Sequence, residues 1–239
     1  REQEVLPGIV NIHGGGLLIG NKEFNRFYCA KLSELGFLVY SLEYRLVPDC
    51  TFFDQLADVS LAMDCIKERI ADDKGDISHV YACADSGGGC LLTYFAAMQK
   101  NPALAEAAHV TPSNFPLRAL GLISGMFYTT RFDQIGLFLP KYLYGKHYKK
   151  EAFAPYVNPE NPGVVASLPP CYLVTSKNDS LQRYTLDFVK ALAKNKVPYR
   201  LQNFPKKAEL THAFSVFYPF LEESSQSIEA MVGFFRKYA

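Results

Sequence analysis

The chain has no excess of charge of either sign and no long hydrophobic run. Its 239 residues include 25 Lys and Arg against 24 Asp and Glu, a formal net charge of +1. This balance offers no electrostatic basis for binding nucleic acid or an anionic membrane surface. No apolar run approaches the roughly 18 residues that span a bilayer. We therefore expect a protein with no membrane span and no nucleic acid partner.

Paired cysteines and metal-ligand clusters are also missing. The six cysteines form no Cys-x-x-Cys pair, and no group of His, Cys and carboxylates has the spacing of metal ligands. Scattered cysteines in a chain of this size are typical of reduced thiols rather than of a disulfide framework. No signal sequence opens the chain, which begins with Arg1 rather than Met, as though an upstream segment were absent. These features predict a cytoplasmic protein without a metal or a cofactor.

Short apolar pieces, in contrast, are abundant. Hydrophobic residues make up 49% of the chain, enough for the core of a single domain spanning residues 1–239. Strand-like and helical stretches alternate, which predicts a mostly parallel sheet with helices on both faces. The expected strands are 9–12, 37–44, 79–84, 117–124, 171–176 and 199–204. The expected helices are 21–35, 52–71, 90–98, 102–108, one that ends at 196, and 222–238.

The stretch 80–91 reads Val-Tyr-Ala-Cys-Ala-Asp-Ser-Gly-Gly-Gly-Cys-Leu. A buried strand that meets a helix at a serine is typical of a nucleophile elbow, a tight turn that projects the Ser86 hydroxyl from the sheet. Glycines suit such a turn because a Cβ would collide with the adjoining strand or helix. Taken alone, the motif favours a glycine-rich turn without a catalytic role. Whether Ser86 is catalytic therefore depends on the other functional groups of the chain.

A second glycine run, 14–16, follows the strand 9–12 and His13. It leaves backbone N–H groups bare above the sheet, as an oxyanion hole requires, although a plain glycine loop explains the residues nearly as well. Ligands bind beyond the carboxyl ends of parallel strands. Because this run and Ser86 both lie at such ends, a catalytic function is favoured.

Three functional groups follow strands in the order Ser86, Asp179, His212. The serine would attack a carbonyl carbon, and the histidine would take its proton and pass it to the leaving group. The aspartate would orient the imidazole and stabilise it when charged. This order is the one found in α/β-hydrolases, and it differs from those of trypsin-like and subtilisin-like enzymes.

Other acids fit the third position less well. Asp85 belongs to the elbow and cannot reach the far nitrogen of the histidine, Asp187 lies within a helix, and Glu209 lies in the histidine loop itself. The remaining histidines of the predicted domain lack partners at a useful spacing. We expect them to be surface residues: His79, His109 and His147.

The segment 126–150 differs from the rest of the chain because it is too apolar for a solvated loop. It is rich in Phe, Tyr and Leu and is interrupted by Pro140 and Gly145. Its place after a strand is where a sheet of this kind can carry an insertion. We interpret it as cap-like helices that line an acyl pocket. Ordinary packing of an outer helix against the core is an equal alternative.

Five ordered motifs resemble those of the hormone-sensitive-lipase-like branch of the α/β-hydrolases, and the likeness covers nearly the whole chain. They are residues 13–16 (HGGG), 44–48 (YRLVP), 85–89 (DSGGG), 168–181 and 212–214 (HAF). The resemblance implies an α/β-hydrolase fold, the triad Ser86, Asp179 and His212, and hydrolysis of carboxylic esters, usually with short acyl chains. It also implies an oxyanion hole made by the backbone amides of Gly14, Gly15 and Gly87.

The chain departs from this family at the elbow and at its beginning. Ala84 replaces a glycine, which would crowd the turn slightly, and Gly87 replaces a more usual alanine. The family carries a cap segment and two strands ahead of the HGGG loop, where this chain has twelve residues. Their loss would leave 37–44 as an exposed apolar edge. We therefore predict that either an upstream segment is missing or a second copy covers this edge in a homo-oligomer, and that the acyl pocket is more open.

Three functional hypotheses follow. The leading one is a serine carboxylesterase that hydrolyses small esters through an acyl-enzyme. The same triad would serve an amidase, a formamidase or a deacetylase, because the pocket selects the leaving group. A ligand-binding relative without turnover is the third hypothesis, and the presence of all three triad residues weakens it.

Overall fold

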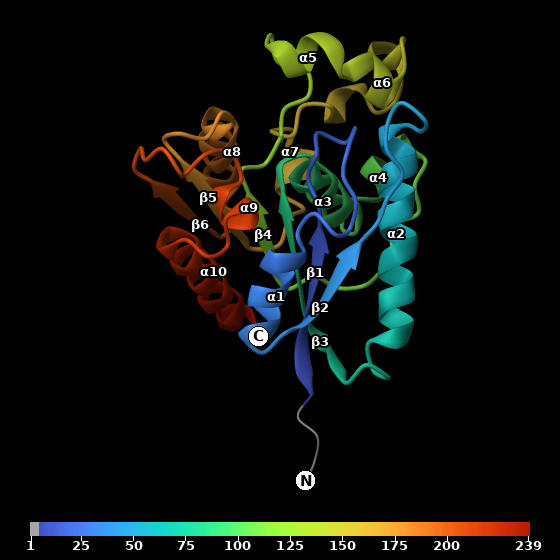
Figure 1. Cartoon of the computed structure of the whole chain (residues 1–239). Helices are drawn as coiled ribbons and strands as arrows, with labels where there is room; N and C mark the ends of the chain where they lie inside the picture. Colours follow the sequence, from blue (N-terminus) through green and yellow to red (C-terminus); the bar gives the residue numbers. More distant parts are fainter. Residues whose placement is uncertain (1–4) are drawn as a thin grey trace.

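One six-stranded parallel sheet organises the protein, whose structure is a computed structural model that describes residues 5–239 (Figure 1). The strand order is β2-β1-β3-β4-β5-β6, and every neighbouring pair is parallel. The strands are Leu6–Ile12 (β1), Leu38–Leu42 (β2), Gly75–Asp85 (β3), Leu120–Ile123 (β4), Cys171–Ser176 (β5) and Tyr199–Phe204 (β6). The sheet confirms the parallel α/β class predicted from the alternating pattern.

Helices cover both faces of this sheet. They are Arg26–Glu34 (α1), Phe52–Arg69 (α2), Ser86–Met98 (α3), Pro102–Ala108 (α4), Gln134–Phe138 (α5), Pro140–Tyr144 (α6), Pro162–Val165 (α7), Gln182–Lys194 (α8), Phe214–Phe217 (α9) and Glu222–Phe235 (α10). Short 3₁₀ turns occupy Tyr148–Lys150 (η1), Ala154–Tyr156 (η2) and Arg236–Tyr238 (η3).

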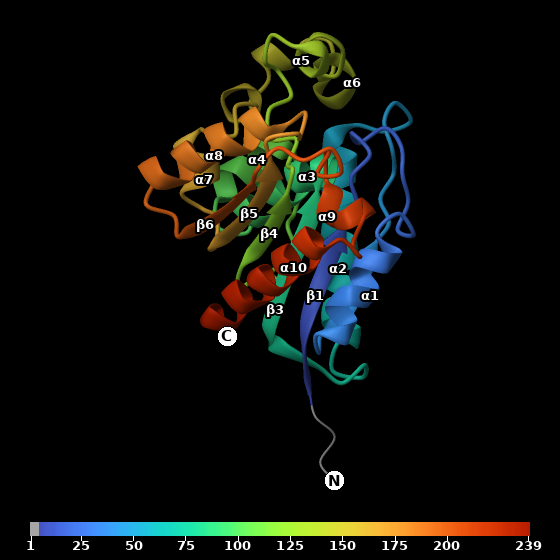
Figure 2. The ribbon, with the colours of Figure 1, turned by 60° about the vertical axis from the view of Figure 1, so that its left-hand side comes forward.

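The two faces have separate cores, because successive strand residues point to opposite sides. In β3, Tyr81 and Cys83 belong to the core shared with α1 and α10, whereas Ala82 and Ala84 belong to the core shared with α2, α3 and α8. The ring of Tyr81 stacks on that of Phe235 at 4.7 Å. Figure 2 shows α1 and α10 on one side of the sheet. The sheet is therefore buried on both faces, as its near-continuous apolar strands require.

Local sequence explains several helix boundaries. Thr51 caps α2, since its side chain accepts the N–H of Asp54 while the Asp54 carboxylate accepts the N–H of Thr51. Asn101 caps α4 in a similar way through the N–H of Leu104, and proline follows at the first helical position. The predicted and observed bounds of α4 are accordingly the same.

Other boundaries differ from those predicted. Helix α3 begins at Ser86 rather than at residue 90, since burial of all its residues overrides the poor helix propensity of three glycines. Helix α1 begins at Arg26 rather than at residue 21, because turns occupy 21–25. Strand β3 begins at Gly75 rather than at residue 79 and continues along β1 past a register shift at Pro7 and Gly8.

His79 has a partner, contrary to the sequence prediction. Its Nδ1 lies 2.5 Å from Oδ2 of Asp76, three residues earlier in β3. The hydrogen bonds from Ser78 and His79 hold the pKa of Asp76 at about 2, below its ordinary value. Both side chains are about one-third exposed, so this is a local pair at the end of the sheet away from Ser86.

Strand β2 forms one edge of the described sheet, as predicted. Among residues 5–239 it pairs only with β1, over the register from Gly8–Leu38 to Ile12–Leu42. Its residues are half-buried apart from Leu42, which is buried. A cleft of about 750 Å³ runs beside it, lined in part by Ser41, Leu42 and Leu61.

The segment 126–150 leaves the body of the molecule and returns. Phe127, near its start, is buried and stacks on Phe188 of α8 with ring centroids 4.1 Å apart. Farther along, α5 has no buried residue. Figures 1 and 2 show α5 and α6 standing beyond the carboxyl ends of the strands. The segment thus combines core packing at its start with an outer element farther on. None of the helices within residues 5–239 has the length and apolarity that crossing a bilayer requires.

Candidate active site

Ser86 lies where β3 ends and α3 begins, with a φ of +47°. This left-handed conformation is costly for a residue with a side chain and is typical of functional turns. Its carbonyl oxygen accepts the N–H of Met126 at 2.8 Å, which fixes the turn against the segment after β4. Ala84, in place of the family glycine, is fully buried in the core beside this turn.

The glycines of the elbow permit a close approach to the loop that follows β1. A Cβ on Gly88 would lie 2.4 Å from the carbonyl oxygens of Ile12 and His13, and one on Gly87 would lie 2.9 Å from the amide nitrogen of Leu17. Side chains cannot occupy these positions unless the backbone moves. Glycine here brings the loop after β1 against the start of α3.

The three predicted triad residues lie within hydrogen-bond reach of one another. Nε2 of His212 is 2.9 Å from Oγ of Ser86, and Nδ1 of His212 is 2.8 Å from Oδ1 of Asp179. Ser86 and Asp179 are buried, whereas the His212 side chain keeps 28% of its surface exposed. A hydroxyl, an imidazole and a carboxylate are thus connected by hydrogen bonds, the set that a serine nucleophile, its base and an orienting acid would form. Of the three, the imidazole is the most exposed to solvent.

Asp179 is held by groups that the sequence did not single out. Its Oδ2 accepts the hydroxyl of Thr175 at 2.7 Å, and its Oδ1 also accepts the N–H of Leu181 at 2.9 Å. Burial acts to raise the pKa of Asp179, but the hydrogen bond and charge of His212 and the Leu181 N–H outweigh burial and keep this pKa below its ordinary value. Asp179 therefore stays ionised at neutral pH, where a negative charge next to the His212 imidazole stabilises its protonated form.

A further serine fixes the histidine loop. Ala213, directly after His212, has a φ of +52°, and its N–H donates to Oγ of Ser124 at 3.0 Å. Ser124 itself follows β4 with a φ of +49° and is fully buried. Neither Thr175 nor Ser124 belongs to a recognisable motif. The only sequence signal was their position at the carboxyl ends of predicted strands.

The loop 13–20 corrects one part of the expected oxyanion hole. The N–H of Gly14 donates to Oδ1 of Asp85 at 3.0 Å and is therefore not free for a ligand. The N–H groups of Gly15, Gly16 and Gly87 have no hydrogen-bond acceptor among the described residues. A Cβ on Gly87 would lie 3.1 Å from the amide nitrogen of Gly16, so these two residues lie close together. The Gly14 N–H is thus not free as expected, whereas the N–H of Gly16 is free within the described residues.

Asp85 forms a buried link between this loop and the elbow. Its Oδ1 accepts the Asn25 side-chain amide at 2.8 Å as well as the Gly14 N–H, while its Oδ2 is buried without a partner in the described part of the chain. Burial raises the pKa of Asp85 above its ordinary value, although the hydrogen bond from Asn25 opposes this. The expectation that Asp85 belongs to the elbow agrees with these contacts.

The side chains of His13 and Tyr44 pack together and bind the backbone of the loop 13–20. Their rings stack with centroids 4.4 Å apart, and the Tyr44 hydroxyl donates to the carbonyl oxygen of His13 at 2.8 Å. His13 is fully buried, and its Nδ1 lies 2.8 Å from the carbonyl oxygen of Gly14. The first two motifs of the chain, 13–16 and 44–48, are therefore in direct contact.

An apolar cavity of about 300 Å³ opens beside this loop. Its walls come from the loop after β1, from the residue whose N–H binds Ser86, and from the outer helices. They are Gly16, Leu18, Met126, Gln134, Ile135, Phe138, Leu139 and Tyr142. The cavity is at the small end of the range for ligand pockets, and it adjoins the free N–H groups on one side.

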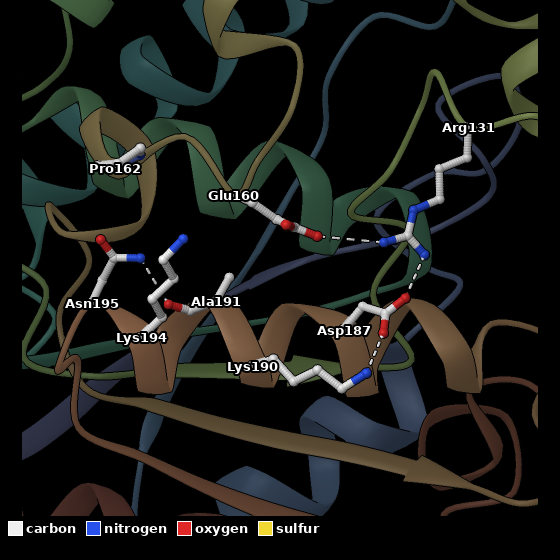
Figure 3. Close-up of a pocket in the computed structure, with 8 residues that line it drawn as sticks. All are labelled: Arg131, Glu160, Pro162, Asp187, Lys190, Ala191, Lys194 and Asn195. Atoms are coloured by element: carbon white, nitrogen blue, oxygen red, sulfur yellow. Dashed lines mark hydrogen bonds and ion pairs between the residues drawn. The ribbon is translucent and has the colours of Figure 1, made fainter.

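A second depression, of about 310 Å³, is lined by charged side chains of α8 and by Arg131 and Glu160, which come from other segments (Figure 3). Arg131 lies between two carboxylates there, 2.8 Å from Asp187 and 3.5 Å from Glu160. Its guanidinium also lies 3.3 Å from the ring centroid of Tyr128. Asp187 is thus committed to Arg131 and Lys190, which agrees with its rejection as a triad member. These contacts anchor the beginning of segment 126–150 to α8.

No cluster of metal-ligating side chains occurs among residues 5–239. The hydrogen bonds that link Ser86, His212 and Asp179 bring a hydroxyl, an imidazole and a carboxylate together, a set of groups that can perform nucleophilic catalysis.

Comparison with known proteins places the chain in a family. A family model for the alpha/beta hydrolase fold matches residues 9–215. The structure is similar to the crystal structure of esterase B from Lactobacillus rhamnosis, with a TM-score of 0.90 and 26% identity, over all of this chain and 78% of that one.

Curated relatives are similar in sequence at lower coverage. Esterase LipQ of Mycobacterium tuberculosis is 28% identical over 110 residues, 44% of this chain and 26% of that protein. A probable isoprenylcysteine alpha-carbonyl methylesterase of Arabidopsis thaliana, ICMEL1, is 25% identical over 72% of this chain and 38% of that protein. The chain thus spans less than half the length of these two relatives. From the family match and the ordered motifs, the chain belongs to the α/β hydrolase fold family, in its hormone-sensitive-lipase-like branch.

Proposed function

We propose that the protein is a serine carboxylesterase that cleaves small carboxylic esters through an acyl-enzyme. The observation that supports this most is the continuous chain from Ser86 Oγ to His212 to Asp179, with separations of 2.9 and 2.8 Å. A buried carboxylate next to the imidazole is what a serine nucleophile requires, because it holds the imidazole in place and stabilises its charge.

In the proposed first step, Ser86 Oγ bonds to the carbonyl carbon of the ester while its proton moves to Nε2 of His212. The tetrahedral intermediate then collapses, the bond to the alcohol oxygen breaks, and the Nε2 proton goes to the departing alcohol. In the second step, water attacks the acyl-Ser86 carbon and gives a proton to Nε2. That proton returns to Oγ as the carboxylic acid leaves.

The oxyanion of each intermediate would be bound by the N–H groups of Gly15, Gly16 and Gly87. Their freedom from acceptors, and the closeness of Gly16 to Gly87 next to Ser86, support this assignment. Such preorganised donors need no movement as negative charge develops. Gly87 also lies in the first turn of α3, where the positive end of the helix dipole adds to the stabilisation.

The apolar cavity beside Gly16 suggests where the acyl chain lies. Its volume of about 300 Å³ suits a short chain rather than a long one. Because Ile135 and Phe138 of α5 line it, we propose that segment 126–150 acts as a cap-like element over the site.

All six cysteines are free, and we propose a cytoplasmic location on that ground.

Replacement of Ser86 by Ala tests the assignment. Turnover of p-nitrophenyl acetate should fall by several orders of magnitude, with roughly 10⁶ as the extreme for triad residues. A serine-directed fluorophosphonate should label the parent chain at Ser86 and leave the variant unlabelled. Ser225→Ala, a change on α10, is the matched control and should keep both properties. Unchanged turnover by Ser86→Ala would disprove the proposal, and a faster rate on the matched anilide would favour an amidase.

A further inference from the structure

Exposed apolar side chains gather at the end of the sheet that carries Ser86. Fifteen large apolar side chains are exposed among residues 5–239, and eleven of them lie in the segments 18–27, 132–142 and 217–220. These segments follow β1, β4 and β6, and the carboxyl ends of parallel strands meet at one edge. The most exposed is Phe132, at 96%. An apolar concentration of this kind marks an interaction surface.

The outermost part of this region is formed by α5 and the residues around it. Phe132, Leu137, Phe138 and Tyr142 are 96%, 58%, 67% and 46% exposed. They belong to the element that Figures 1 and 2 show farthest beyond the sheet. Within α5, half-buried Ile135 packs against the core, whereas Leu137 and Phe138 are mostly exposed. Core packing therefore does not account for the exposed apolar side chains of this region.

Positive charge lies directly beside these side chains. Lys141, Lys146, Lys149 and Lys150 are all exposed, and none has an ion-pair partner within the described residues. The stretch 134–150 contains no Asp or Glu. The four lysines line a depression of about 430 Å³ together with Leu137 and Pro140. Apolar and cationic groups thus share one face, which we call the α5–η1 face.

The α5–η1 face is continuous with the candidate active site. Leu137 of α5 borders the lysine-lined depression, whereas Ile135 and Phe138 of the same helix line the apolar cavity beside Gly16. One helix therefore separates the charged surface from the cavity. A molecule held at this face would lie next to the entrance of that cavity.

We infer that the α5–η1 face binds the surface of an anionic lipid assembly. Exposed aromatic and aliphatic side chains enter the headgroup boundary, and neighbouring lysines attract anionic headgroups. An acidic protein or a nucleic acid would satisfy the lysines but leave Phe132 and Leu137 in water. The balanced charge of the whole chain conceals this local concentration of lysines, and the proposal departs here from the expectation based on net charge. The inference concerns binding and does not depend on the proposed hydrolysis.

A tryptophan reporter tests the apolar half of the inference. The chain contains no tryptophan, so Phe132→Trp introduces a single tryptophan, which can be excited selectively at wavelengths that tyrosine does not absorb, at a site that is 96% exposed. Its emission should shift to the blue with vesicles of phosphatidylcholine and phosphatidylserine and shift less with phosphatidylcholine alone. Leu61→Trp, at an exposed position on α2, is the control and should show no shift. The absence of a shift at position 132 would overturn the inference.

The charge half is tested by vesicle sedimentation of the unlabelled chain. Each lysine near an anionic surface strengthens binding roughly fivefold, so Lys146→Gln, Lys149→Gln and Lys150→Gln combined should weaken it about 100-fold. The matched control is Lys100→Gln, Lys194→Gln and Lys237→Gln combined, which should bind as the parent does. About 1 M salt should abolish binding to the anionic vesicles by screening. Binding to heparin but not to vesicles, or equal binding by both triple variants, would overturn the inference.

Discussion

The carboxylate of Asp85 accepts the backbone N–H of Gly14 at 3.0 Å across 71 residues of sequence. This bond joins the nucleophile elbow to the glycine loop, so that the serine and the proposed oxyanion donors are positioned by one side chain. Asn25 holds the same carboxylate oxygen at 2.8 Å. The residue next to the nucleophile therefore acts as a positioning residue.

Asp85→Ala should lower kcat about 10²-fold and leave KM nearly unchanged. The loop would lose its tether, and the loss of one oxyanion donor costs about 10²–10³. Asp85→Asn keeps a carbonyl oxygen for the Gly14 N–H and should retain activity within about tenfold of the parent. Steady-state kinetics on p-nitrophenyl acetate measures both, with thermal unfolding as a check on folding. Equal kcat values for Asp85→Ala and the parent would contradict the positioning role.

Gly88→Ala should destabilise the fold by about 3 kcal/mol, the upper end of the range for overpacking. The new Cβ would lie 2.4 Å from two backbone carbonyl oxygens, which cannot rotate away. Gly233→Ala is the matched control, since nothing lies within 4 Å of a Cβ there and the residue is within α10. It should stabilise the protein by about 0.5–1 kcal/mol. Urea unfolding measures the stability of the two variants. Similar unfolding midpoints would contradict the predicted steric clash at position 88.

The stabilisation provided by Asp179 should disappear in acid. Because the folded-state pKa of Asp179 is below the ordinary 3.8, the folded chain binds fewer protons at this group than the unfolded chain does. Its contribution is therefore fully present above the ordinary pKa and is lost as the pH falls through the lower folded value. Asp179→Asn should thus reduce the unfolding free energy more near about pH 6 than near about pH 2. A pH-independent difference in urea unfolding would refute this.

Ile135 should control acyl-chain length. Ile135→Phe narrows the apolar cavity beside Gly16, so kcat/KM for a butyrate or hexanoate ester should fall at least about tenfold relative to acetate. Leu137→Phe, on the neighbouring part of α5 that borders the lysine-lined depression, should leave the ratio unchanged. The measurement is a rate series over p-nitrophenyl esters. Parallel changes in both variants would show that the chain lies elsewhere.

The β2 edge should support self-association of this chain. An uncovered strand edge leaves N–H and C=O groups available for pairing with another chain, and β2 pairs only with β1 among residues 5–239. Sedimentation equilibrium should show a concentration-dependent dimer that Ser41→Lys, a change within the edge strand β2, weakens. Ser33→Lys on α1 serves as the charge-matched control. A monomer at all concentrations would rule out the homo-oligomer.

Sequence reasoning was strongest where a local pattern has one structural solution. Pro102 after Asn101 set the first turn of α4 within the predicted bounds, and alternating apolar runs led to the parallel sheet. It was weakest where packing opposes propensity. Three glycines form the first turn of α3 because its neighbours leave no room for side chains, and residues 21–25 leave the predicted helix to form turns.

The primary structure by itself determined which side chains meet at the proposed active site, because Ser86, Asp179 and His212 each follow a strand and parallel strands deliver their carboxyl ends to one edge. Only the tertiary structure decided which backbone N–H groups are free. Gly14 and Gly16 are chemically identical in the sequence, and a carboxylate 71 residues away consumes the first and leaves the second. Hydrogen bonds between distant segments depend on register and packing, and no local pattern encodes them.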